Sequence, residues 1–332
     1  RRRSINLAQL VAALAGGPLF LVTRAGAVQL WTLYAGVLVI ACAGTFEGPA
    51  RVALLPQIVG TERFQRAVTI SSTNQALAFA SGPALGGMLI AGFGIVVAYG
   101  TFLALIAVAF VTVWGLHIGP NVLTTRRTLS LAAIREGLSF VWHRPVVLGC
   151  MALDMFAVIF GGATALLPIY ANEILRVGPR GYGLLNSALE IGALSMALTL
   201  MLRPPIRAAG RTLLTVVALY GVATIVFGLS RFFPLSLAAY IAAGMADQVS
   251  VVLRSTAIQL STPDELRGRV SSVNLLFIGA SNQLGAAESG FVAALTTPTF
   301  SVVSGGIACL CVVLVIALRM PELRGYRIEP KH

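Results

Sequence analysis

Long runs of apolar residues alternate with short polar segments along the whole chain. A run of about 20 apolar residues forms a helix long enough to cross about 30 Å of hydrocarbon, because each residue adds about 1.5 Å. The pattern therefore predicts an all-α membrane protein. We expect ten spanning helices, at residues 4–23, 29–50, 68–91, 95–116, 146–170, 182–202, 212–230, 235–256, 270–295 and 299–319.

The composition supports a membrane protein and excludes several other classes. Hydrophobic residues make up 57% of the chain and charged residues only 11%, whereas soluble domains contain about 25% charged residues. The net charge of +12 does not indicate nucleic-acid binding, since the arginines lie in short loops between apolar runs. Lys331 is the only lysine, which excludes a Walker-type phosphate loop. The cysteine spacing fits neither a zinc site nor a disulfide framework, so we expect no metal and no cofactor.

The positive charges are strongly biased to one side of the predicted membrane. When loops are assigned alternately to the two sides, 20 of the 24 Lys and Arg residues fall on one side. Loops rich in Lys and Arg face the cytoplasm. We therefore expect both termini of this chain to be cytoplasmic. The exceptions are Arg24, Arg176, Arg180 and Arg231.

Two charged segments, "GTERFQRAVTISS" at 60–72 and "STPDELRGRVSS" at 261–272, indicate an internal repeat. A shift of 203 residues places Arg51 on Arg254, Glu62 on Glu265, Arg66 on Arg269, Gly82 on Gly285 and Gly87 on Gly290. Such repeats are typical of transporters built from two related halves. The second half holds six predicted helices and the first only four. We therefore expect two further helices before Arg1 in the intact protein.

The repeat divides the chain into four predicted segments. A half bundle at 1–116 precedes a cytoplasmic linker at 117–145, a six-helix bundle at 146–319 and a cytoplasmic tail at 320–332. Within the linker, "LSLAAIREGLSFVWHR" has apolar residues at helical spacing. This amphipathic helix would lie along the inner membrane surface or pack under the bundle.

Three motifs give the chain a family resemblance. "SGPALGG" at 81–87 looks like the Gly-Pro-x-x-Gly-Gly core of the fifth-helix motif of exporters in the major facilitator superfamily. "ALLPIYANEILRVGPRGYGLL" at 165–185 and "TPDELRGRVSSV" at 262–273 are similar to the branch that contains the enterobactin exporter and macrolide-efflux proteins. The resemblance implies a two-fold bundle of twelve helices, of which the first two are missing here. It also implies a monomer in the bacterial inner membrane and no enzymatic activity.

The exporter motif supplies the first candidate residues, Gly82, Pro83, Gly86 and Gly87. In exporters this motif is taken to shape the transport path near a contact between the two halves. Glycine lets helix backbones approach closely, and proline bends a helix and frees a carbonyl group. Ordinary tight packing of membrane helices is the alternative.

Carboxylates inside the spans supply the second set of candidates. A carboxylate at mid-membrane costs about 2.5–3.5 kcal/mol or more, so it needs a wet cavity, a partner or a proton. We predict that Asp154, Glu190 and Asp247 lie in a central cavity and take part in proton coupling or substrate binding. Asp247 could instead pair with Arg254, seven residues further on the same face. Glu47 and Arg51 are spaced as a structural i,i+4 pair.

Charged residues at the cytoplasmic ends supply the third set. We hypothesise that Arg51, Glu62, Arg66, Arg254, Glu265 and Arg269 form an inner gate of ion pairs that hold the halves together. Anchoring by the positive-inside rule is the alternative. Part of the second segment also reads as a helix start, with Thr262 as N-cap, Pro263 as first residue and Glu265 as capping-box partner.

The favoured hypothesis is a secondary-active exporter that moves a small amphipathic molecule outward by alternating access, in exchange for protons. Its partners would be a small-molecule substrate, protons and the lipid bilayer. A polytopic membrane enzyme acting on a lipid-linked substrate is one alternative. An inactive truncated transporter is the other.

Overall fold

A computed structural model describes residues 2–59, 64–115, 131–204 and 206–328. The described residues are helical with no strand, and they form two compact units. The first unit comprises residues 1–78 and 85–126, and the second comprises residues 79–84 and 127–332.

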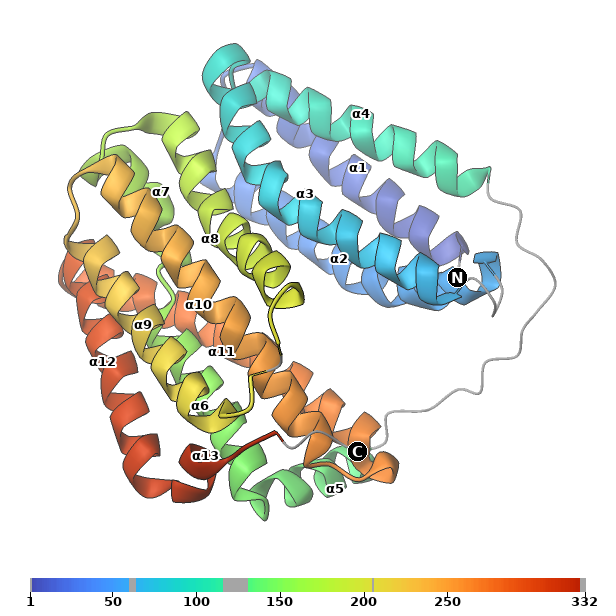
Figure 1. Cartoon of the computed structure of the whole chain (residues 1–332). Coiled ribbons are helices and arrows are strands. Elements are labelled where there is room, and N and C mark those ends of the chain that lie inside the picture. The colour runs from blue at the N-terminus through green and yellow to red at the C-terminus, as the bar shows by residue number, and fades with distance from the viewer. Residues whose placement is uncertain (1, 60–63, 116–130, 205, 329–332) are drawn as a thin grey trace. The chain divides into compact units, whose positions relative to one another are not determined.

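The first unit contains α1 (Arg2–Arg24), α2 (Leu30–Val59), α4 (Ile95–Trp114) and most of α3 (Phe64–Phe93). Helix α1 packs against both α2 and α4, as the blue and green ribbons of Figure 1 show. Glycines allow these close approaches, because a Cβ at Gly36 would overlap Leu19 and a Cβ at Gly16 would press on Phe102.

The second unit is a helical bundle with a helix lying across its end. The bundle is built from α6 (Pro145–Gly161), α8 (Gly178–Met201), α9 (Ala209–Leu229), α10 (Phe233–Leu260), α11 (Asp264–Leu295) and α12 (Pro298–Arg319). Helix α10 packs against α8 and α9, whereas α12 packs against α6 and α9. The short α13 (Pro321–Gly325) follows α12 and packs on α6 and α9.

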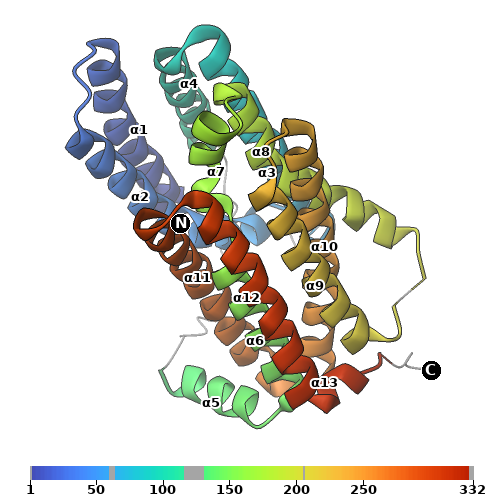
Figure 2. The same ribbon diagram turned by 90° about the vertical axis from the view of Figure 1, so that its left-hand side faces the viewer.

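The linker helix is α5 (Leu131–Trp142), and it packs against α11 and α6. Figure 2 shows it lying across the ends of these helices. Val141 is buried, and a Cβ at Gly137 would press on the Arg269 backbone. Of the two placements that the sequence left open, the structure supports packing under the bundle.

The predicted helix at 146–170 is interrupted, which the apolar run did not reveal. Helix α6 ends at Gly161, and the chain continues through a 3-10 turn (Thr164–Leu166), the short α7 (Leu167–Ile169) and a π-helical turn (Tyr170–Ile174). Gly162 has an extended backbone with φ −77° and ψ 96°, which ends the α-helical hydrogen bonding. The run of apolar side chains continues past this point, so hydropathy alone does not mark the break.

Two separate hydrophobic cores fill the second unit. One core gathers the part of α6 up to Ala157 with α9, the second half of α10, and the C-terminal part of α12. The other begins at Ala163 and includes Tyr170, Phe227 and Tyr240. The rings of Tyr170 and Phe227 stack with centroids 4.7 Å apart. The break after α6 therefore lies between the two cores.

Nine of the described helical segments are long and apolar enough to cross a membrane. They correspond to nine of the ten predicted spans. The tenth prediction, 270–295, lies within α11, a helix of 32 residues that carries charged residues in its first turns. An all-α membrane architecture is therefore confirmed.

Candidate transport site

A buried ion pair joins two helices of the second unit. Asp154 of α6 pairs with Arg254 of α10, and their exposed fractions are only 9% and 4%. The spacing on α10 allowed Asp247 to pair with Arg254, but in the structure Arg254 pairs with Asp154. Arg254 was also a predicted inner-gate residue, and it is one of the most deeply buried charged residues described. The pair neutralises two charges that would each be costly in the bilayer.

Asp247 and Asp154 line the same narrow cavity between α6, α9 and α10. Its volume of about 10 Å³ is close to the least that one water molecule needs. Tyr220 and Ser250 contribute the other polar groups of its wall. The structure thus brings two of the three predicted carboxylates together.

Glu190 approaches this site from α8, within electrostatic range of Asp247. Helix α8, which carries Glu190, packs against α10 so closely that the two backbones are in contact. A Cβ at Gly192 would overlap the Ile241 carbonyl, and a Cβ at Gly244 would overlap the Leu189 carbonyl. These glycines therefore let the two acid-bearing helices cross in backbone contact.

Side chains from other helices satisfy the carbonyl groups that the α6 break leaves free. The Tyr220 hydroxyl donates to the Gly161 carbonyl at 3.1 Å, and the Thr224 hydroxyl approaches the same oxygen at 3.4 Å. The Ser289 hydroxyl of α11 donates to the Gly162 carbonyl at 3.0 Å. A broken helix inside a membrane is tolerated where such partners replace its lost hydrogen bonds. Sequence reasoning missed this feature, for which the Gly161-Gly162 doublet is the available signal.

Three of the predicted inner-gate residues, Arg51, Arg254 and Arg269, have ion-pair partners in the described structure. Arg269 forms an ion pair with Glu136 of the linker helix, and both side chains are partly exposed. Glu265 is exposed, Glu62 lies outside the described residues, and the Arg66 side chain is not described either. Whether these residues gate transport stays a prediction.

The helix start is displaced by one residue, to Asp264, and the predicted capping of it by Thr262 is wrong. The Thr262 hydroxyl donates back to the Ile258 carbonyl at 2.6 Å, and Pro263 occupies the N-cap position of α11 without a side-chain cap. The Thr262 hydroxyl is therefore directed toward the helix before it rather than toward α11.

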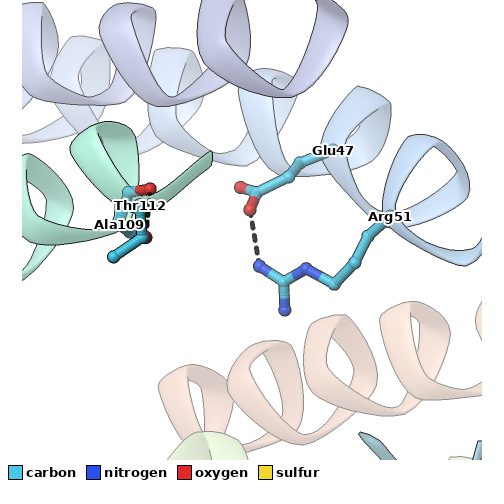
Figure 3. Close-up of polar contacts among 4 residues, drawn as sticks. All are labelled: Glu47, Arg51, Ala109 and Thr112. Atoms are coloured by element: carbon cyan, nitrogen blue, oxygen red, sulfur yellow. Dashed lines mark hydrogen bonds and ion pairs between the residues drawn. The ribbon is translucent and has the colours of Figure 1, made fainter. Parts of the chain in front are cut away.

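The predicted pair on α2 is confirmed. Arg51 donates to the Glu47 carboxylate at 2.5 Å, and the Arg51 side chain is 70% exposed. Figure 3 shows the two side chains one turn apart on the same helix, beside the hydrogen bond from Thr112 to the Ala109 carbonyl.

The exporter motif lies entirely within α3, which stays helical through Pro83. A Cβ at Gly82 or at Gly86 would meet nothing within 4 Å in the described structure, whereas Gly87 is buried. The role of the motif in shaping a path stays a prediction.

The arrangement gathers ionisable side chains inside an apolar bundle. It offers two carboxylates with a cavity between them, a third acid nearby, and one buried guanidinium group. Among the described residues, no three His, Cys, Asp or Glu side chains gather as a metal site.

Comparison with known proteins gives the family. The transmembrane secretion effector family matches residues 1–332. The enterobactin exporter of Escherichia coli O1:K1 is 26% identical over 282 residues, which are 85% of this chain and 67% of that protein. The enterobactin exporter of Escherichia coli O45:K1 (strain S88) matches to the same extent. Both relatives are transporters.

A solved structure agrees on the fold. The crystal structure of a bacterial homologue of the iron transporter ferroportin, in its outward-facing state, has a TM-score of 0.52 at 16% identity. The match covers 97% of this chain and 81% of the other. The chain is thus a multi-pass membrane protein of the transmembrane secretion effector family, within the major facilitator superfamily.

Proposed function

We propose that this chain is a secondary-active exporter that exchanges a small amphipathic molecule for protons by alternating access. The observation that carries the proposal is the cavity lined by Asp154 and Asp247 inside an otherwise apolar bundle. Ionisable groups within a membrane bundle are expensive and mark substrate or proton pathways. A carboxyl group held there can take a proton on one side and release it on the other.

An amphipathic substrate is supported by a second hollow beside the cavity. It has a volume of about 460 Å³ and lies between α8, α9 and α10, with a wall of apolar side chains only. Ala246 lines both the hollow and the carboxylate cavity. A molecule with an apolar body and a polar end matches this pairing of surfaces. Similarity to the enterobactin exporters makes a siderophore-like compound the first substrate to try.

The membrane orientation in the proposal comes from the distribution of arginines. The excess of Lys and Arg supports a cytoplasmic position for both ends of this chain, with the linker helix on the same side. Glu136 and Arg269 then lie at the cytoplasmic end of the second unit. Because both of its residues lie in the second unit, we assign this ion pair to docking of the linker helix on α11.

The docking role of this ion pair makes a measurable prediction. Replacing either Glu136 or Arg269 by glutamine should loosen the docking of α5 by up to about 1 kcal/mol, since the pair is partly exposed. Hydrogen exchange of the α5 amides should then accelerate by up to about fivefold. The double change Glu136→Arg with Arg269→Glu should restore slow exchange. The matched control is Glu265→Gln, which removes an exposed acid of α11, and equal acceleration there would contradict the assignment.

Transport itself is tested with the protein reconstituted in liposomes. Export of a fluorescent cationic dye and of enterobactin should each be measured with an imposed pH gradient, with and without a protonophore. We expect gradient-driven export of at least one compound and its loss with the protonophore. Glu173→Gln, which removes an exposed acid, should leave export unchanged. Export that continues at full rate without a gradient would contradict proton exchange.

A further inference from the structure

One guanidinium group serves a site with two carboxylates. Arg254 is paired with Asp154 across the α6–α10 contact. Asp247 lies seven residues before Arg254 on α10, about two helical turns away along the same face. Both carboxyl groups line one small cavity. They differ because Arg254 is paired with Asp154 and not with Asp247.

The second acid has no cation of its own among the described contacts. The described ion pairs include Arg51 with Glu47, Arg254 with Asp154, and Arg269 with Glu136, and none of these three involves Asp247. The ionisable and hydroxyl groups recorded near Asp247 are Asp154 of α6, Glu190 of α8, Tyr220 of α9 and Ser250 of α10 itself. One step further away, Cys150 lies near Arg254, and Tyr240 and Cys309 lie near Tyr220.

These surroundings give the two carboxyl groups different chemistry. A carboxylate that touches a buried guanidinium is stabilised in its charged form, because protonation would leave the cation unpaired in a low dielectric. A carboxylate beside a second acid and without a cation is stabilised when it binds a proton. Binding a proton therefore costs less free energy at Asp247 than at Asp154.

We propose that Arg254 is a positioning residue that keeps Asp154 charged and thereby leaves Asp247 as the carboxyl group that carries the coupling proton. The inference rests on the proposed proton-coupled export and identifies the carrier within it. An O–H bond forms on Asp247 when a proton arrives from outside, and the same bond breaks when the proton leaves to the cytoplasm. Asp154 and Arg254 keep their charges throughout the cycle.

The first test follows export driven by a pH gradient in liposomes. Asp247→Asn should lose gradient-driven export. Arg254→Gln should lower the rate of gradient-driven export, because Asp154 without its cationic partner then competes with Asp247 for the proton. The double variant Asp154→Asn with Arg254→Gln should recover most of what Arg254→Gln loses. A double variant that exports less than Arg254→Gln, or an Asp247→Asn variant that stays gradient-driven, would overturn the proposal.

The second test reads protonation directly and needs no transport. Infrared difference spectra of the purified full chain in lipid nanodiscs, taken across a pH step, should show a protonated-carboxyl band that disappears in Asp247→Asn. Arg254→Gln should add a second band from Asp154, and the double variant should remove that second band while keeping the first. Loss of the wild-type band in the double variant would assign the proton to Asp154 and overturn the proposal.

The two tests separate this inference from the function on which it rests. If the wild-type protein exports its substrates without regard to the pH gradient, proton exchange fails as its function. The infrared bands still decide which carboxyl group titrates. A band assigned to Asp247 supports the inference about Arg254, and a band assigned to Asp154 contradicts it.

Discussion

Replacing Arg254 by leucine should lower the free energy of unfolding of the protein by about 3–5 kcal/mol, because it leaves the Asp154 carboxylate buried and unpaired. Both members of the pair are less than 10% exposed, so neither solvent nor lipid headgroups can replace the lost partner. Unfolding in mixed detergent micelles, followed by tryptophan fluorescence, measures the loss directly.

The cause can be separated from a simple packing defect. Adding Asp154→Asn to Arg254→Leu removes the orphaned charge and should recover most of the lost stability. Arg231→Leu removes an exposed arginine whose described contact is a hydrogen bond to Thr299, and we expect it to change stability by less than about 0.5 kcal/mol. If the double variant is as unstable as Arg254→Leu, packing rather than charge holds these helices together.

The second large effect is expected at the crossing of α8 and α10. Gly244→Ala adds one methyl group where the Leu189 carbonyl already lies, and backbone atoms cannot rotate away as side chains can. We expect a loss of about 1–3 kcal/mol in the free energy of unfolding, as for other overpacked interiors. Gly192→Ala should behave alike, since its Cβ would overlap the Ile241 carbonyl.

Gly279 of α11 is the matched control for that prediction. A Cβ there meets nothing within 4 Å in the described structure. Alanine favours a helix over glycine by up to about 1 kcal/mol, so Gly279→Ala should be neutral or slightly stabilising. Equal destabilisation by Gly279→Ala and Gly244→Ala would show that the crossing is not the cause.

The sequence predicted the membrane-spanning helices better than the side-chain contacts between them. Apolar length identifies a span whatever it packs against, so nine of the predicted spans correspond to apolar helices of the structure. Glu47 and Arg51 were predictable as a pair because both lie on one helix, where spacing fixes distance. Asp154 and Arg254 lie 100 residues apart, and no local pattern records that α6 and α10 bring them together.

The end of α6 and the role of Thr262 could not be predicted from hydropathy, because both depend on which hydrogen-bond partner a polar group takes. The apolar run through Gly161 and Gly162 looks continuous, yet Tyr220, Thr224 and Ser289 supply the hydrogen bonds that let the helix stop there. Thr262 has the side chain of an N-cap, but its hydroxyl bonds to the turn before it. In both cases the local sequence allows two conformations, and a hydrogen bond to another helix or to the preceding turn selects one of them.

The two hydrophobic cores of the second unit have a consequence for how that unit fluctuates. They meet where α6 stops, at Gly161 and Gly162, and no α-helical hydrogen bonding crosses this point. Local unfolding follows cooperative blocks of contacts rather than whole chains. The break therefore lets the segment from Ala163 to Ile174 loosen from the core around Phe227 without passing that loosening along α6 to Asp154.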